Sequence, residues 1–229
     1  MSKRFVITDI HGCFLSFKKL WEDQLKPDAG DMVYFLGDYI NKGPGSKQVL
    51  DFLMQLQESG SHQVKFLKGN HEQILLDVLR GYADLDEFYD KGGSFTLESF
   101  GVKEVGQIPP LYLSFFESLE LYYETHDAYL VHAGFNFEYP DPFMDSEAMF
   151  TIRSFQVDNS IINNKKIIHG HVPTDLNTIT RNFQQQSQVL DIDGGCVYPY
   201  REGMGHLIGL ELNSWDLYIQ PCIDEVIET

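Results

Sequence analysis

The sequence predicts an α/β fold in which helices flank a sandwich of two β-sheets. Two observations support this prediction. Apolar strands alternate with amphipathic helices in the first 80 residues, and short strands separated by turns follow residue 121. A β-α-β-α-β-α order favours a parallel sheet with crossover helices, whereas short strands joined by turns favour a second sheet, mixed or antiparallel. With helices outside both sheets, the chain would form a four-layer sandwich.

Three strands and three helices alternate in the N-terminal part of the chain. Short apolar runs at 3–8, 32–36 and 64–67 are typical of buried strands. Apolar residues at helical spacing follow each run, so a helix is expected after each strand. The residues with this spacing are Phe14, Phe17, Trp21 and Leu25 for the first helix, Val49, Phe52, Leu53 and Leu56 for the second, and Leu75, Val78 and Leu79 for the third.

Residues 84–119 are expected to be helical and to form a cap or insertion beside the site. Both this stretch and the rest of the chain would belong to a single domain of residues 1–229, since large α/β domains often reach this length. Six further strands are expected after the helical stretch, at 129–132, 166–171, 178–183, 188–192, 207–212 and 217–220.

Composition argues against nucleic-acid and membrane partners. The formal net charge of −17 repels nucleic-acid backbones and anionic membrane surfaces. The chain has no run of about 18 apolar residues and no signal-peptide pattern, so we expect a cytoplasmic protein. Its cysteines, Cys13, Cys196 and Cys222, are odd in number and not spaced as Cys-x-x-Cys. Neither a disulfide framework nor a structural zinc site is therefore expected.

Polar side chains follow the predicted strands at the points where the strands end. They lie in five short motifs: Asp9-Ile10-His11-Gly12, Gly37-Asp38-Tyr39, Gly69-Asn70-His71-Glu72, His132-Ala133-Gly134 and Ile168-His169-Gly170-His171. Because the carboxyl ends of parallel strands meet in one crevice, we expect these side chains to lie close together.

The residue types in these motifs indicate a metal site. Carboxylates and imidazoles suit manganese, iron and zinc, and the set is too large for one tetrahedral ion. Two ions about 3.5–4 Å apart, sharing a carboxylate, would use the whole set. Asp38 is the candidate for the shared carboxylate, because it follows the middle of the three strands in sequence.

Each motif taken alone also has a purely structural explanation. Asn70 could cap the helix that follows it, Glu72 could favour its first turn, and His132 could be a hydrogen-bonded core residue. These explanations do not account for five such motifs in order, each at a strand end. We therefore interpret the set as functional.

The five motifs together resemble those of the calcineurin-like metallophosphoesterase superfamily, over about residues 4–195. The pattern is most similar to the phosphoprotein phosphatase branch, which includes bacterial and phage serine/threonine phosphatases and symmetrical diadenosine tetraphosphatases. The resemblance implies a two-sheet sandwich flanked by helices. It also implies two divalent metal ions, manganese first, with iron and zinc as alternatives.

The resemblance implies a role for each motif residue. One ion would be held by Asp9, His11 and Asp38, and the other by Asp38, Asn70, His132 and His171. His71 would act as general acid or hydrogen-bond donor to the leaving oxygen. His169, on the same expected strand two residues earlier, is the alternative to His171.

The sequence departs from the family pattern beside His71. Asn41 takes the place of the acidic partner of this histidine. An amide can accept a hydrogen bond from the imidazole but cannot stabilise imidazolium by charge, so we expect the pKa of His71 to be lower than in relatives. Lys42 replaces an arginine, which keeps the charge but loses bidentate phosphate binding. Lys68 also stands where arginine is common, whereas Arg153 resembles the arginine that binds substrate phosphate in bacterial members.

The expected activity is hydrolysis of phosphomonoesters by a serine/threonine phosphatase-like enzyme, with a phosphorylated protein or small phosphate ester as substrate. One alternative is a dinucleoside polyphosphate hydrolase, whose bases would bind an aromatic pocket formed by Phe88, Tyr89 and Phe95. A second alternative is a weakly catalytic, metal-binding regulatory protein, which the departures at Asn41 and Lys42 motivate.

Overall fold

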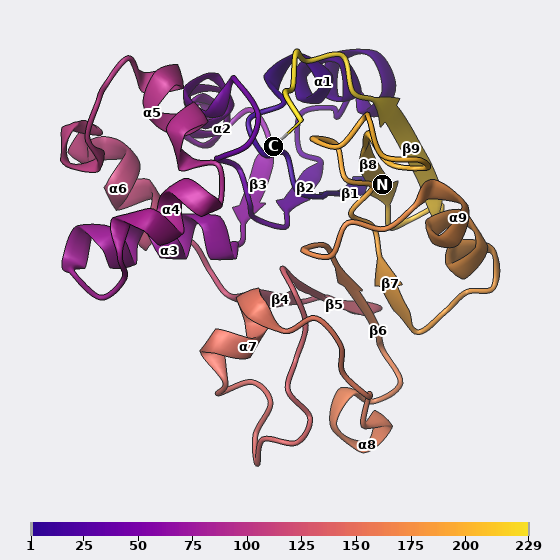
Figure 1. The fold of residues 1–229 in the computed structure, drawn as a ribbon. Helices are drawn as coiled ribbons and strands as arrows, with labels where there is room; N and C mark the ends of the chain where they lie inside the picture. The colour runs from indigo at the N-terminus through magenta and orange to yellow at the C-terminus, as the bar shows by residue number, and fades with distance from the viewer. Residues whose placement is uncertain (1, 229) are drawn as a thin grey trace.

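The computed structural model describes residues 2–228 and contains two β-sheets that pack face to face, with helices outside them (Figure 1). One sheet has five strands in the order β3-β2-β1-β8-β9, and the other has four in the order β4-β5-β6-β7. The predicted α/β class, with two sheets flanked by helices, is confirmed.

The described chain runs through its helices and strands in the following order. The elements are β1 (Arg4–Ile7), α1 (Phe14–Lys19), a π-helical turn (Leu20–Leu25), β2 (Met32–Phe35), α2 (Ser46–Ser59), β3 (Gln63–Phe66), α3 (Asn70–Arg80), α4 (Leu85–Asp90), α5 (Gly93–Phe100), a 3₁₀ turn (Val105–Gln107), α6 (Pro110–Glu117), β4 (Tyr122–Glu124), β5 (Ala128–Val131), α7 (Ser146–Thr151), α8 (Asn159–Ile162), β6 (Lys166–His169), α9 (Leu176–Gln184), β7 (Val189–Asp191), β8 (His206–Glu211) and β9 (Asp216–Pro221).

The first sheet combines the N-terminal strands with the last two strands of the chain. β1, β2 and β3 are parallel, as predicted. We expected residues 207–212 and 217–220 in the second sheet, and this was wrong. β8 pairs antiparallel with the free edge of β1, where Phe5 lies opposite Glu211, and β9 pairs with β8. Strand spacing along the chain carries no information about such a long-range pairing.

The second sheet is mixed, with β4 antiparallel to β5 and with β5, β6 and β7 parallel. The expected strand at 178–183 is wrong, because this segment lies in helix α9. Asp175 caps the helix by accepting a hydrogen bond from the Thr178 N–H at 3.0 Å. Leu176, Ile179 and Phe183 then pack on the core at helical spacing, which outweighs the strand preference of the β-branched residues.

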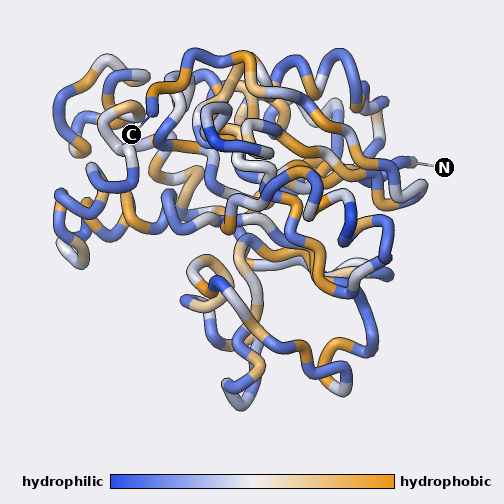
Figure 2. Tube along the Cα trace, turned by 45° about the vertical axis from the view of Figure 1, so that its right-hand side comes forward, coloured by the Kyte–Doolittle hydropathy of each residue, from blue (hydrophilic) through white to orange (hydrophobic). Residues whose placement is uncertain are grey.

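Successive residues of the inner strands enter different cores, which explains why these strands are apolar throughout. Phe5 and Ile7 of β1 pack under α1 and α2, whereas Val6 packs between the sheets. Ile168 of β6 meets it there, while Ile167 packs on the outer face of the second sheet. Figure 2 shows this apolar centre as a band of hydrophobic strands.

Residues 84–119 form helices, as expected, and they pack beside the first sheet rather than over the second (Figure 1). Pro110 begins α6, where its missing N–H costs no helical hydrogen bond. Phe115 of α6 packs on Phe66 of β3 with ring centroids 5.2 Å apart. Within residues 2–228, none of the helices is long and apolar enough to cross a membrane.

The core between the sheets should be sensitive to loss of volume at Ile168. Its side chain has no exposed surface, so Ile168→Ala should lower the free energy of unfolding by about 2–5 kcal/mol. Urea denaturation measures this loss. Ile227→Ala is the control, because Ile227 is 65% exposed and should change stability by less than about 0.5 kcal/mol. Equal effects of the two substitutions would contradict the assigned packing.

Candidate metal centre

The predicted ligands gather where strands of both sheets end. β1 and β2 end just before Asp9 and Asp38, and α3 begins with Asn70 directly after β3. From the second sheet, His132 follows β5 and His171 follows β6. The packing of the two sheets therefore brings side chains from five strand ends together.

The carboxylate of Asp38 lies at the centre of this group. Its Oδ2 is 3.5 Å from Nε2 of His11, 3.5 Å from Nε2 of His132 and 3.8 Å from Nε2 of His71. Its Oδ1 accepts a hydrogen bond from the His71 N–H at 3.1 Å. One buried carboxylate thus contacts imidazoles from three separate segments.

Two sets of potential ligand atoms share this carboxylate. His11, Asp38 and His71 form one set, and Asp38, His132 and His171 form the other, with the ligand atoms of each set within 4.8 Å of one another. This arrangement fits a carboxylate shared by two cations. Asp9 lies outside both sets, where it accepts hydrogen bonds from the Thr8 hydroxyl at 2.7 Å and the His171 N–H at 3.0 Å.

Backbone carbonyls orient two of the histidines. Nδ1 of His11 lies 3.0 Å from the Ile40 carbonyl oxygen, and Nδ1 of His132 lies 2.9 Å from that of Leu36. A carbonyl only accepts, so each Nδ1 donates and each Nε2 presents a lone pair towards Asp38. This second contact is typical of metal-binding histidines.

The amide oxygen of Asn70 lies between the two histidines of the second sheet. Its Oδ1 is 3.0 Å from Nδ1 of His171 and 3.3 Å from Nε2 of His132. Nε2 of His171 is buried and has no hydrogen-bond partner among the described residues. A buried polar atom without a partner is costly, and a cation would satisfy it. The donor set therefore fits divalent metal ions.

The site depends on unusual backbone conformations. The φ angles of His11, Asp38 and His171 are +45°, +51° and +72°. Such left-handed residues other than glycine are uncommon and cluster at functional sites. His171 contributes a ring nitrogen to the candidate ligand atoms, whereas His169 does not. The ring of His169 packs on Phe155 instead, with centroids 5.7 Å apart.

Glycines allow two of the carboxylates to approach the backbone. A Cβ atom at Gly69 would collide with Oδ1 of Asp38, and one at Gly170 would collide with Oδ1 of Asp9. Each carboxylate therefore lies against a backbone segment that carries another predicted ligand. The glycines in the motifs thus make room for the neighbouring motif's carboxylate.

Glu72 has a structural role that our sequence analysis missed. Its side chain has no exposed surface and accepts hydrogen bonds from the N–H groups of Asp38 at 3.0 Å, Tyr39 at 2.8 Å and Gly69 at 3.0 Å. It thereby fixes the loops after β2 and β3 relative to each other. The sequence signal was its place directly after Asn70-His71, which we interpreted only as a favourable first turn.

Asn41 contacts His71 with the opposite polarity from the one we considered. Its Nδ2 lies 2.9 Å from Nδ1 of His71, while its Oδ1 accepts a hydrogen bond from the Thr96 hydroxyl at 2.7 Å. A carboxamide nitrogen donates, so Nδ1 of His71 accepts and the proton of the neutral ring lies on Nε2. The amide oxygen, which we considered as an acceptor for His71, instead accepts from Thr96 of α5.

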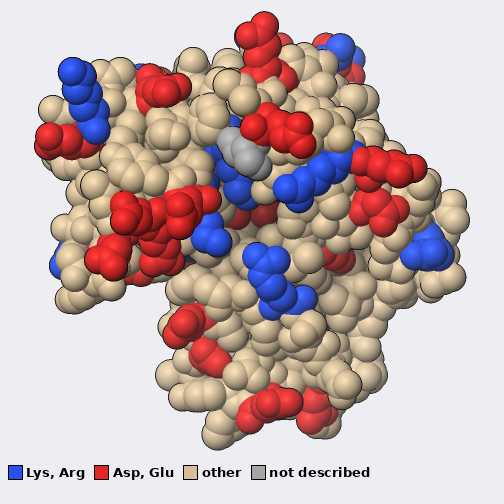
Figure 3. Space-filling view, viewed as in Figure 1, with Lys and Arg blue, Asp and Glu red and all other residues tan. Residues whose placement is uncertain are grey.

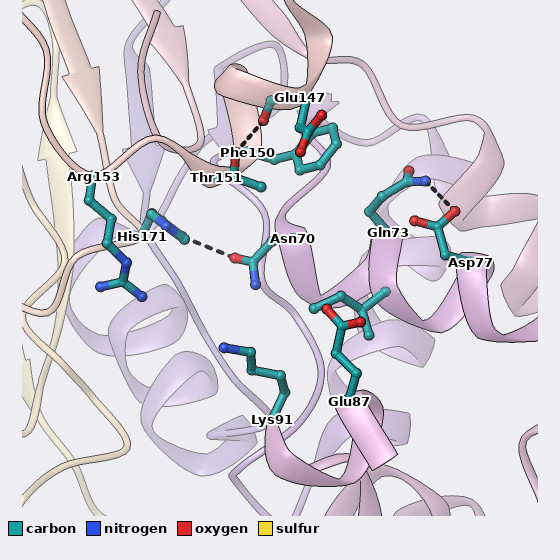
Figure 4. Close-up of a pocket in the computed structure, with 11 residues that line it drawn as sticks. Asn70, Gln73, Asp77, Glu87, Lys91, Glu147, Phe150, Thr151, Arg153 and His171 are labelled. Carbon is teal, nitrogen blue, oxygen red and sulfur yellow. Dashed lines mark hydrogen bonds between the residues drawn. The ribbon is translucent and has the colours of Figure 1, made fainter. Parts of the chain in front are cut away.

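The predicted basic residues lie in different places. Nζ of Lys42 is 3.0 Å from Nε2 of His11, and Arg153 lies beside His171 at the mouth of the site (Figure 4). Lys68 does not line this opening; its ammonium donates to Gln73 at 3.3 Å. The structure therefore brings Lys42 and Arg153 to the site and leaves Lys68 beside it.

Two cavities of about 510 and 430 Å³ meet at the site and share Asn70, Lys91, Arg153 and His171. We call the larger the acidic lobe, because Asp77, Glu87 and Glu147 line it (Figure 4). We call the smaller the aromatic lobe; its lining includes Lys42, Tyr89, Phe95, Tyr198 and Arg201. Figure 3 shows Lys and Arg side chains around the central hollow and a cluster of Asp and Glu to its left.

Phe88 does not belong to the aromatic lobe, contrary to the expectation for a base-binding pocket. Its ring is fully buried and faces Gly93, where any larger residue would collide with it. Neighbouring positions of a helix face different directions, so Tyr89 opens to the cavity while Phe88 enters the core.

Comparison with known proteins decides the family. A family model described as calcineurin-like phosphoesterase matches residues 3–198. The chain belongs to this family. The resemblance drawn from the five motifs is thereby confirmed.

Individual relatives of this calcineurin-like phosphoesterase carry different names. A symmetrical bis(5'-nucleosyl)-tetraphosphatase of Buchnera aphidicola is 34% identical over 34% of this chain and 27% of the relative. Serine/threonine-protein phosphatase BSL2 of Arabidopsis thaliana is 33% identical over 34% of this chain and 8% of the relative. The chain thus matches less than a third of either relative. A solved structure described as a putative diadenosine tetraphosphatase shares the fold, with a TM-score of 0.69 and 18% identity over 96% of this chain and 93% of the other.

The protonation of the phosphoesterase site reflects its burial. Burial raises the pKa of Asp38 to about 7 and that of Asp9 to about 6, and repulsion from the Asp38 carboxylate also acts to raise the pKa of Asp9. Burial, and then the Lys42 ammonium, lower the pKa of His11 and of His71 well below the ordinary value. The low pKa expected for His71 thus follows mainly from desolvation.

Asp38 should make the metal-free protein less stable as the pH rises. Its folded-state pKa of about 7 exceeds the ordinary 3.8, so the folded state binds more protons than the unfolded state between these values. The free energy of unfolding of Asp38→Asn, relative to that of the unsubstituted chain, should therefore increase as the pH rises from about 4 to 7. The gain should exceed about 1 kcal/mol, because one pKa unit corresponds to about 1.4 kcal/mol.

Urea unfolding of both proteins in chelator, at about pH 4.5 and pH 7.5, measures this difference. Histidines that do not contact residue 38 contribute equally to both proteins. A stability difference that does not change with pH would contradict the raised pKa of Asp38.

Proposed function

We propose that this chain is a two-metal phosphoesterase whose preferred substrate is a nucleoside polyphosphate, with dinucleoside polyphosphates as the leading class. The observation that carries the proposal is the meeting of two cavities at the metal-ligand cluster, one of them lined by aromatic and basic side chains. A substrate with a phosphate chain between two nucleosides would place its phosphates at the cluster and a nucleoside in each lobe.

The metal ligands proposed are those suggested by the motifs. Asp9, His11 and Asp38 would hold one ion, and Asp38 would share in holding the other with Asn70, His132 and His171. The mixed nitrogen and oxygen donors suit manganese first, with iron or zinc as alternatives. Bound divalent ions would supply Lewis-acid chemistry that polarises a phosphoryl oxygen and lowers the pKa of water.

Basic side chains at the junction of the lobes would bind the phosphate chain. Arg153 and Lys91 line both cavities, so either can reach a phosphate at the cluster (Figure 4). Lys42 donates to the ring nitrogen of His11 that a cation would need. Occupation of that nitrogen by an ion would leave the Lys42 ammonium free for a phosphate oxygen.

His71 is the proposed proton donor. The contact of Asn41 with Nδ1 leaves the proton on Nε2, and this nitrogen faces Asp38 at 3.8 Å. Donation of this proton to the leaving oxygen would complete cleavage of the phosphorus–oxygen bond. A neutral ring donates less readily than imidazolium. Burial lowers the pKa of His71, and Asn41 supplies no negative charge to raise it, so a slower acid step is the proposed consequence.

Aromatic side chains support the choice of a nucleoside. Tyr89 is 39% exposed and lines the aromatic lobe together with Phe95. Tyr198, distant in sequence, lines the same cavity. The guanidinium of Arg201 stacks 4.0 Å from the centre of the Tyr198 ring, which makes a flat cationic surface. Such surfaces stack on nucleobases.

A second candidate function is removal of phosphate from phosphoserine or phosphothreonine in proteins. The acidic lobe favours it, because Asp77, Glu87 and Glu147 could bind basic residues beside a phosphorylated side chain. A weakly catalytic regulatory protein is the third candidate, and the absence of metal-dependent turnover would favour it.

Manganese should restore activity to chelator-treated protein, and His132→Ala should abolish most of it. His132 has no exposed surface, and its Nε2 faces both Asp38 and Asn70. Loss of this ligand should reduce manganese-dependent hydrolysis of p-nitrophenyl phosphate by about a hundredfold or more.

The matched control is His126→Ala, because the His126 side chain is 92% exposed and lies at the surface beside Asp127. Full activity in both variants would contradict the proposed ligand set. Inactive wild-type protein with two bound manganese ions would instead favour the regulatory alternative.

Tyr89→Ala should weaken binding of diadenosine tetraphosphate without affecting small substrates. Stacking on an aromatic ring is worth about 1–3 kcal/mol per base, so KM should rise about tenfold while kcat changes little. Tyr89→Phe retains the ring and should behave like the unsubstituted protein. Steady-state kinetics with diadenosine tetraphosphate, p-nitrophenyl phosphate and a phosphoserine peptide make the comparison. Preference for the peptide, unaffected by Tyr89→Ala, would favour the protein phosphatase candidate.

A further inference from the structure

The three cysteines converge at a point outside the phosphoesterase site. Cys13 directly precedes α1, Cys196 follows β7, and Cys222 directly follows β9. Their sulfur atoms nevertheless lie within 4.8 Å of one another. Cys13 and Cys196 are buried, and Cys222 is partly exposed. Segments separated by up to about 200 residues therefore present three thiols to one small volume.

This spacing fits coordination of a thiophilic ion. A tetrahedral zinc ion with zinc–sulfur bonds of about 2.3 Å holds its sulfur ligands roughly 3.8 Å apart. Thiolates select zinc and copper(I) over the hard cations that carboxylates prefer. We propose that Cys13, Cys196 and Cys222 form a three-thiolate site for such a d¹⁰ ion, with zinc as the leading candidate. The partial exposure of Cys222 leaves a fourth position open to solvent.

The surroundings of the cluster are already held in place. The Asp224 carboxylate accepts hydrogen bonds at 2.9 Å from the N–H groups of Leu15 and of Ser16, at the start of α1. The Cys222 N–H donates to the Gly205 carbonyl oxygen at 2.8 Å. These contacts fix the C-terminal segment beside α1 (Figure 1). The neighbouring thiols, Cys13 first, lower the pKa of Cys222, whereas the pKa values of Cys13 and Cys196 are raised, so the metal-free cluster favours one thiolate, at Cys222.

An ion here would join the C-terminal segment to the loops that carry the phosphoesterase motifs. Cys13 lies two residues after His11, and Cys196 lies three residues after Asp193, a buried carboxylate. The bound ion would therefore stabilise the segment that positions Asp9 and His11. From the sequence we did not expect a structural zinc site, because the cysteines are odd in number and not spaced as Cys-x-x-Cys. Neither their number nor their spacing shows which distant cysteines meet.

Cobalt(II) distinguishes this site from the phosphoesterase centre. None of the proposed ligands at that centre is a cysteine, so thiolate-to-cobalt charge-transfer absorption in the near ultraviolet can arise only from the three-thiol cluster. The full chain, purified under reducing conditions and stripped with chelator, should develop this band as cobalt is added. Zinc should displace the cobalt and remove the band.

Cys222→Ser is the test variant, because its side chain is the most accessible of the three. It should lose most of the charge-transfer band and bind one fewer zinc ion per chain, while keeping manganese-dependent phosphatase activity. His132→Ala should keep the band. Excess zinc should raise the Tm of the unsubstituted chain by about 5–10 °C more than that of Cys222→Ser.

Two results would overturn the proposal. The first is absence of the band at saturating cobalt while thiol titration finds all three cysteines reduced. The second is a disulfide between two of them in the freshly purified chain, shown by a mass lower by two hydrogens that reductant restores. Both readouts are independent of catalytic activity, so they hold whether or not the proposed function is correct.

Discussion

The carboxylate of Asp38 is the group on which the arrangement of the site depends. It is almost fully buried, yet it approaches three imidazoles within 3.8 Å. Burying a carboxylate without a countercharge is unfavourable, which is why its pKa is raised. The surrounding structure holds the carboxylate in this position: Glu72 accepts hydrogen bonds from the adjacent N–H groups, and Gly69 leaves room for the carboxylate. Bound cations would supply the countercharge that this buried carboxylate lacks.

Both sheets are needed to bring the candidate metal ligands together. Asp9, Asp38 and Asn70 follow strands of the first sheet, whereas His132 and His171 follow strands of the second. The distances between these groups are therefore set by the apolar core that joins the sheets. The last two strands extend the first sheet beyond β1 and bring the C-terminal segment back to α1. Core packing, chain topology and site geometry are thus coupled.

Much of this organisation could be predicted from the sequence, because strand ends and motif residues coincide in a parallel sheet. The convergence of the candidate ligands, the central position of Asp38 and the helical stretch after residue 84 all followed from local pattern. What could not be predicted rests on long-range contacts. The sheet joined by β8, the hydrogen bond from Thr96 to Asn41, the bonds accepted by Glu72 and the meeting of the three cysteines each link distant segments. In α9, a helix cap outweighed β-branched composition that locally favours a strand.

The central claim is that Asp38 joins two metal ions in one site. Electron paramagnetic resonance of chelator-treated protein, titrated with manganese(II), tests it most directly. Two ions that share a carboxylate should give an exchange-coupled spectrum at two equivalents per chain, and Asp38→Asn should lose the coupling. A spectrum of isolated manganese ions at full occupancy, unchanged by that substitution, would contradict the account.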